Sequence, residues 1–234
     1  MAGIDATPHR AAYRIAEAPA AGTVALTFLG HASFLIESAG GVTAVTDWNA
    51  IVRPPFPPDI VTMNNAHPMH YVTTVEPGIR YALRGWNPEG GLPHHDVTYR
   101  DMRVRNVPTN YDEAPLGRAN SIFIFEVAEL CIAHLGHLHK ILSNEELGAL
   151  GQVDVLLAPV DGAYTIDQDA MVQVIDSIGA PLLIPMHYFT LDTLARFLDR
   201  LRGRYVIKAS DNPRVLLSRE ALPKTREVLV LPGD

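Results

Sequence analysis

The chain consists of short apolar runs, and several of them end in a loop that carries histidine. In the first half, runs rich in β-branched and aromatic residues alternate with glycine-containing turns, which predicts a β meander over residues 23–29, 33–37 and 42–46. Residues 47–59 contain four prolines and are predicted to be a loop, because proline cannot donate to a β ladder. The apolar run 59–63 is then a strand that leads into the first histidine-rich loop.

The second half changes from strands alone to alternating strands and helices. Ser143 and Glu146 have the spacing of a capping box, which predicts the start of a short helix. Before them, strands are expected over 97–107, 121–127 and 130–134, and after them the pattern predicts strand 153–158, helix 167–178, strand 181–186 and helix 191–201. A meander followed by alternating elements favours an α/β fold of stacked sheets flanked by helices.

The N-terminal segment differs in composition from the rest. Residues 1–22 are rich in alanine and proline and lack the continuous apolar stretch of a secretory signal, so we expect a flexible N-terminal leader. Residues 23–234 are predicted to form one domain, because a chain of 234 residues is compatible with a single α/β domain.

Charge and hydrophobicity restrict the partners. The formal net charge is -7 without a basic run, which argues against nucleic acid, and no segment reaches the roughly 18 apolar residues of a membrane span. We therefore expect a small-molecule substrate, no nucleic acid and no membrane, and leave a homo-oligomer open. The single Cys131 cannot form an internal disulfide, which fits a cytoplasmic location; a periplasmic one is left open if a signal peptide was removed.

Five loops that follow apolar strands carry the candidate site residues. They are 30–33, 65–70, 108–113, 134–139 and 185–188. Loops held by a rigid scaffold are where functional sites are commonly built, so we expect these segments to converge.

On these segments the chain resembles the metallo-β-lactamase-fold hydrolases, and among them the ascorbate-6-phosphate lactonase-like proteins. The resemblance rests on Phe28–Phe34, Asp154–Gly162 and Ile184–Tyr188, and it extends from Val24 to about Leu201. It implies an αββα four-layer sandwich in a single domain.

The family typically binds two metal ions through a His-x-His-x-Asp-His motif, an isolated His, a bridging Asp and a final His. By this resemblance His67, His70 and His187 match metal ligands. The remaining four positions depart from the pattern: Asn65 replaces the first His, Met69 the Asp, Asn110 the isolated His and His137 the bridging Asp.

These departures change the predicted chemistry. Without the two carboxylates, two close dications would repel each other with little compensation, so we expect one metal ion per chain. The predicted ligands are His70, His137 and His187, with His67 as a fourth ligand or a supporting partner. Three imidazoles with an open position suit zinc, and iron and copper are the alternatives. Met69 is expected to line the pocket, although its thioether could also bind Cu(I).

A proton acceptor has to come from elsewhere, because Met69 cannot take the role of the family's Asp. Asp161 and Tyr188 are the candidate catalytic residues, while Asp112 and Glu113 are expected to be solvated. The other histidines have separate predictions. His31 is expected either to hydrogen-bond near the site or to be structural, and His139 is a reserve ligand. His134 is expected to be structural, and His94 and His95 are expected to be exposed.

Three functions follow from this interpretation. The first is a metal-dependent hydrolase acting on a small molecule, by analogy a lactone, an ester or a phosphorylated compound. The second is a non-catalytic relative that uses the old pocket for ligand or partner binding. The third is a metal-dependent redox or oxygen-using enzyme on the same fold.

Overall fold

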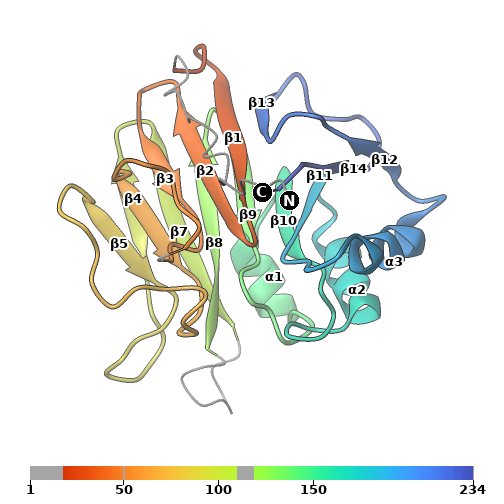
Figure 1. The fold of residues 1–234 in the computed structure, drawn as a ribbon, viewed down its shortest axis with the longest axis horizontal. Coiled ribbons are helices and arrows are strands. Elements are labelled where there is room, and N and C mark those ends of the chain that lie inside the picture. Colours follow the sequence, from red (N-terminus) through yellow and green to blue (C-terminus); the bar gives the residue numbers. More distant parts are fainter. Residues whose placement is uncertain (1–17, 50, 110–118, 234) are drawn as a thin grey trace, which may run out of the picture.

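A computed structural model of the protein describes residues 18–49, 51–109 and 119–233. Two β-sheets pack face to face (Figure 1). The smaller sheet has six strands in the order β13-β1-β2-β3-β4-β5. Their bounds are β1 Thr23–Gly30, β2 Ser33–Ser38, β3 Thr43–Val45, β4 Ile60–Met63, β5 Tyr81–Arg84 and β13 Arg214–Ser218.

The larger sheet has eight strands in the order β12-β14-β11-β10-β9-β8-β7-β6. Their bounds are β6 Asp96–Tyr99, β7 Met102–Thr109, β8 Asn120–Val127, β9 Leu130–His134, β10 Val155–Pro159, β11 Leu182–Met186, β12 Val206–Ala209 and β14 Glu227–Val230. Strands β6 to β9 pair antiparallel, whereas β9, β10, β11, β14 and β12 run parallel. Parallel neighbours end at the same edge, which brings their following loops together.

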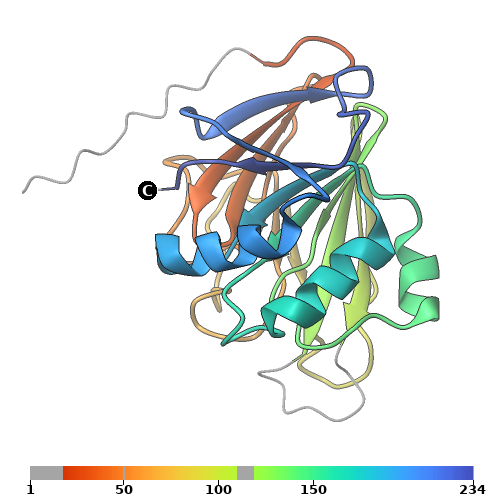
Figure 2. The same cartoon turned by 90° about the vertical axis from the view of Figure 1, so that its right-hand side faces the viewer.

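Three described helices cover the outer face of the larger sheet: α1 Asn144–Leu150, α2 Gln168–Ile178 and α3 Leu191–Leu201 (Figures 1 and 2). The capping box of Ser143 and Glu146 starts α1, as the spacing predicts. Gly179 ends α2 in the left-handed conformation, with a φ of 71°, where glycine carries no steric cost. These local signals explain why the sequence located the helices well.

Strand β8 shows how one strand serves both faces of the larger sheet. Phe123 and Phe125 point into the core between the two sheets, while Ile122 and Ile124 pack under the helices. All four side chains are completely buried, as expected for a strand with an apolar layer on each side.

The α/β sandwich and the strands of the meander are confirmed. In the described part of the chain, the outer face of the six-stranded sheet is covered by loops rather than helices, with Trp48 and Trp86 buried beneath them. Strands β12, β13 and β14 were not expected, since only pairing with distant strands stabilises these short, partly exposed runs.

The described residues before β1 are 18–22; the rest of the predicted leader lies outside the described part of the chain. No helix among the described residues is long and apolar enough to span a bilayer. Cys131 is a partly buried free thiol. The cytoplasmic location stays a prediction.

Candidate metal centre

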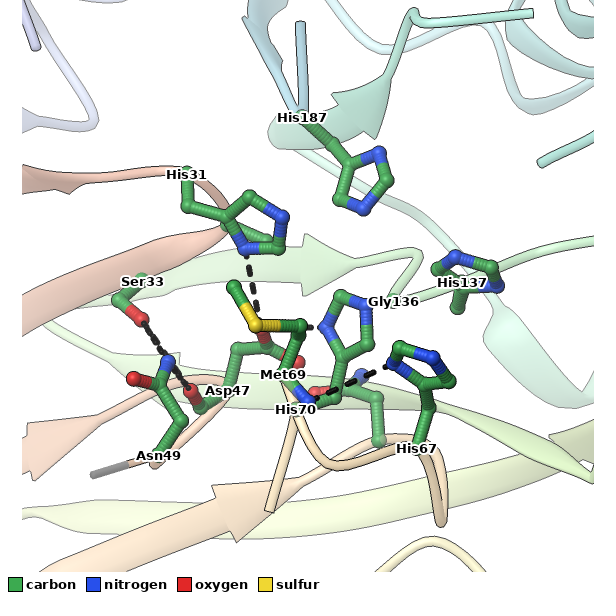
Figure 3. Close-up of polar contacts among 12 residues, drawn as sticks. His31, Ser33, Asp47, Asn49, His67, Met69, His70, Gly136, His137 and His187 are labelled. Carbon is green, nitrogen blue, oxygen red and sulfur yellow. Dashed lines mark hydrogen bonds and ion pairs between the residues drawn. The ribbon is translucent and has the colours of Figure 1, made fainter. Parts of the chain in front are cut away.

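Histidines from four loops meet at one end of the sandwich (Figure 3). His31 follows β1, His67 and His70 follow β4, His137 and His139 follow β9, and His187 follows β11. The convergence expected from the sequence is therefore present for the described loops, while Asn110, Asp112 and Glu113 lie outside the described residues.

Three of these histidines form the tightest group. His31, His70 and His187 each offer a ring nitrogen, and these nitrogens all lie within 4.8 Å of one another. The ring centroids of His31 and His187 are 4.4 Å apart, and that of His70 lies 5.1 Å and 5.3 Å from them. Among the described residues, this is the set of side chains whose spacing suits a shared metal ion.

Two buried carboxylates orient this group from behind. Nδ1 of His70 lies 2.7 Å from Oδ2 of Asp47, and Nδ1 of His187 lies 2.9 Å from Oδ1 of Asp161. An ionised carboxylate can only accept a hydrogen bond, so Nδ1 of each ring is the donor, and in the neutral ring Nε2 is left with its lone pair. A carboxylate behind a histidine in this way is the usual support of a metal ligand.

The carboxylates are held in the ionised form. Burial by itself would raise the pKa of Asp47, but the charge and hydrogen bond of His70 hold it below the ordinary value. Burial also opposes ionisation of Asp161, yet hydrogen bonds from His187, Thr165 and the backbone hold the pKa of Asp161 far below its usual range. Each pair therefore presents a polarised imidazole to the space between the histidines.

The imidazoles of His31 and His137 are neutral at physiological pH. Burial and then the charge of His187 lower the pKa of His31 to about 4. Burial and the charges of His70 and His187 lower the pKa of His137 to about 3. Burial works against protonation of His70 as well, but the Asp47 carboxylate raises its pKa. Metal ligation requires neutral imidazoles; burial supplies them at His31 and His137, whereas His70 would release a proton when it binds a cation.

Two buried polar atoms at the centre have no hydrogen-bond partner among the described residues: Nδ1 of His31 and Oδ1 of Asp47. Buried polar groups without a partner are rare because their desolvation is uncompensated. Together with three converging imidazoles, they fit the binding of one divalent ion of borderline softness, such as zinc.

His31 is the member of the group for which the sequence left two roles open. Both His31 and His187 have positive φ angles, 55° and 53°, and the amide of His187 donates to the carbonyl of His31 at 2.7 Å. This bond ties the ends of β1 and β11 together and sets both rings side by side. A histidine in the left-handed region is strained, and such strain is concentrated at functional sites.

His137 and His67 lie next to the group, and the ring of His137 is as close to His70 and His187 as the rings of the group are to one another. The ring of His137 is centred 4.8 Å from His70 and 5.1 Å from His187, and its Nδ1 lies 2.8 Å from Nε2 of His139. His67 is exposed, and its ring centroid is 5.7 Å from that of His70. The predicted ligand roles of both residues stay predictions.

The two predicted catalytic residues occupy different environments. Both carboxylate oxygens of Asp161 are engaged, with His187, the Thr165 hydroxyl and three backbone amides. This arrangement suits a residue that positions His187 better than one that accepts a proton. The Tyr188 hydroxyl lies 3.5 Å from the carbonyl of Leu231, in a groove beside the histidines. Their catalytic roles stay predictions.

Asp47 belongs to the candidate site, although the sequence indicates it only as the start of a loop. Its carboxylate supports His70, its carbonyl accepts from Ser33 and Asn49, and its φ is 52° (Figure 3). The sequence could have indicated Asp47 by its position just after an apolar strand, because His31 also follows an apolar strand directly.

Two of the substituted motif positions, Asn65 and Met69, lie in the described loop after β4. Asn65 is buried and donates from Nδ2 to the carbonyl of Ala119, next to the bridge that Asn65 forms with Asn120. Met69 is 39% exposed at the rim, as expected for pocket lining. His134 is buried and hydrogen-bonded to Ala32, which agrees with the structural role predicted for it.

The fold and the histidine-rich end define the class of protein. Residues 25–187 match the beta-lactamase superfamily domain, and the chain belongs to this superfamily. The narrower assignment to the ascorbate-6-phosphate lactonase-like branch stays a prediction.

Among its relatives is a UPF0173 metal-dependent hydrolase of Methanoculleus marisnigri, which is 27% identical over 76% of this chain and 86% of that protein. A candidate Zn-dependent hydrolase of the metallo-beta-lactamase superfamily from Thermotoga maritima has a similar structure, with a TM-score of 0.67, 28% identity, and 90% of this chain and 100% of that chain covered. The metallo hydrolase Igni18 of Ignicoccus hospitalis shares the fold at 19% identity, with a TM-score of 0.61 over 84% of this chain and 99% of that chain.

Proposed function

We propose that the protein is a metal-dependent hydrolase that acts on a small molecule at a mononuclear site formed by His31, His70 and His187. The observation that carries the proposal is the pair of buried Asp–His hydrogen bonds, Asp47 to His70 and Asp161 to His187. In a metal site, a carboxylate behind each imidazole fixes the orientation of the ring and makes it a stronger ligand. A pocket that had lost its metal would gain nothing from two such buried pairs.

The expected number of ions is one per chain. Each of the two described carboxylates at the site accepts a hydrogen bond from Nδ1 of a histidine, which is the role of a residue that supports a ligand rather than that of a bridging ligand. The other imidazoles near the group, those of His67 and His137, carry no negative charge to offset a second ion. Zinc is the first candidate, and iron and copper are the alternatives because imidazole suits all three.

The bound ion would polarise a substrate carbonyl and lower the pKa of water to about 7. The chain contributes orientation: Asp47 and Asp161 fix the His70 and His187 rings, and burial of both pairs keeps bulk water from competing for them. His137 is close enough to the group to contact a substrate, and Met69 closes one side without accepting a proton.

Redox or oxygen-using chemistry is the second candidate. An all-imidazole donor set binds iron and copper as well as zinc, and Met69 brings a thioether to the rim. The identity of the metal separates the two activities.

The test begins with elemental analysis of protein purified without added metal. About one zinc per chain, lost in His70→Ala and His187→Ala, supports the site. Cobalt titration of the metal-free protein then measures affinity; Asp47→Asn and Asp161→Asn should weaken it by about 10–100-fold. Asp211→Asn, at an exposed position, is the matched control. Absence of metal in the wild type together with no cobalt binding would contradict the proposal and favour a non-catalytic relative.

Activity is measured with the metal-loaded protein on a neutral ester, a lactone and a phosphomonoester. Hydrolysis of at least one class that disappears in His187→Ala supports a hydrolase. Stoichiometric iron or copper without any hydrolysis favours the redox candidate instead.

A further inference from the structure

We infer that the groove beside the histidine group binds an uncharged, apolar arm of the substrate, and that Phe189 determines specificity for that arm. The inference rests on the proposed function and deepens it, because it selects apolar esters and lactones over phosphorylated compounds. Three observations carry it: the composition of the groove, its continuity with the metal centre, and the exposed apolar side chains beside both.

The groove has a volume of about 400 Å³ and shares His31 with the metal centre. It lies between the end of β1, the first half of α3 and the segment after β14, elements that adjoin in Figures 1 and 2. Its size is in the range of pockets that hold small organic ligands. An arm placed in it would leave the reacting group of the same molecule next to His31.

The described walls of the groove are mostly apolar, with His31, Tyr188 and Ser210 as the polar side chains among them. Leu191, Leu194, Val230 and Leu231 form much of its surface, and none of the described residues that line it carries a fixed positive or negative charge. Recognition of a phosphoryl group relies on arginine, lysine or converging amides, and no arginine or lysine lines the described groove. An alkyl or aryl arm suits these walls, whereas a phosphate would lose its hydration without a charged partner.

Phe189 contacts His31, which the groove shares with the metal centre, and in the chain it lies between Tyr188 and Leu191, which both line the groove. Its ring centroid is 5.2 Å from that of His187 and 5.8 Å from that of His31, and it contacts Tyr164 at 5.5 Å. Yet Phe189 is 57% exposed, Tyr164 is 66% exposed and Leu191 is 77% exposed. Large apolar side chains that stay exposed beside a pocket and a candidate metal centre mark a surface that is covered when a ligand binds.

The first arm of the test measures hydrolysis of a series of p-nitrophenyl esters, from acetate to hexanoate, by the metal-loaded protein. Each added methylene should raise kcat/KM by about fourfold until the groove is filled, as expected for burial of one methylene. Phe189→Ala should flatten this dependence by raising KM for the longer esters. Val206→Ala, at an exposed apolar position on the edge strand β12, is the matched control and should keep the wild-type dependence.

The second arm does not depend on catalysis. The neutral fluorophore N-phenyl-1-naphthylamine is titrated into the protein as purified, and Phe189→Ala should weaken its binding at least severalfold relative to wild type and Val206→Ala. Equal binding by all three proteins overturns the groove assignment, even if the esters are hydrolysed. Specific binding without hydrolysis of any ester supports the groove while contradicting the proposed function. Faster hydrolysis of a phosphomonoester than of every neutral ester would also overturn the inference.

Discussion

His134 allows a quantitative prediction of how stability depends on pH. The residue ends β9 and is completely buried; its Nε2 lies 2.7 Å from the carbonyl of Ala32, and its Nδ1 accepts from the amide of Gly136 at 3.2 Å. The neutral ring satisfies both contacts, whereas a protonated ring would direct a second N–H at the Gly136 amide. Burial lowers the pKa of His134 from 6.5 to about 4.

The sign follows from proton binding. Below pH 6.5 the unfolded chain takes up a proton at this residue, while the folded chain does so only near pH 4. Because the unfolded state binds more protons in this interval, the free energy of unfolding falls as the pH falls. Between pH 8 and pH 5 the loss from this one residue is about 2 kcal/mol, and it approaches about 3 kcal/mol at pH 4.

The assay is urea unfolding of chelator-treated protein at pH 8 and at pH 5, comparing wild type with His134→Gln. The substitution should cost about 1–2 kcal/mol at pH 8 through the lost hydrogen bond. Its loss between pH 8 and pH 5 should be about 2 kcal/mol smaller than that of wild type.

Histidines elsewhere contribute equally to both proteins and cancel in the difference between them. His94→Gln, at an exposed position, controls for removal of an imidazole from the surface. If His134→Gln loses as much stability between the two pH values as wild type, the linkage reasoning is refuted.

Three further substitutions test the scaffold by thermal or chemical unfolding. Gly136→Ala should destabilise the fold by about 2–4 kcal/mol, because φ is 63° and a Cβ would lie 2.5 Å from Oδ1 of Asn120; an unchanged midpoint would contradict the packing of this turn. Phe197→Ala empties a fully buried position under α3 and should cost about 3–5 kcal/mol, and a loss below 1 kcal/mol would show that the helix is not anchored there. Ser143→Ala removes the capping box of α1 and should cost about 1 kcal/mol, with Ser143→Asp expected to restore most of it.

Much of the fold could be predicted because its signals are local. The proline-rich loop, the capping box at Ser143 and the glycine stop at Gly179 each act over a few residues, and the structure has the corresponding elements in place. The strands β12, β13 and β14 could not be found this way. Strands β13 and β14 are stabilised by ladders with β1 and β11, which are distant in the chain, and β12 is stabilised by its ladder with β14. None of the three short strands has a periodicity that reveals it in the sequence.

For the candidate site, too, some features could be predicted from the sequence and others depend on the tertiary structure. The sequence alone predicted the class of fold and the loops that carry the histidines. It also predicted His70 and His187 as metal ligands. Only the tertiary structure decided that His31 completes the tightest group and that Asp47 and Asp161 stand behind two of its imidazoles. The reason is physical: which nitrogen faces a carboxylate depends on strand pairing and on the positive φ angles of residues after β1, β3 and β11. A pattern of residue types identifies which side chains could take part in a site, whereas the packing of distant strands determines which of them meet.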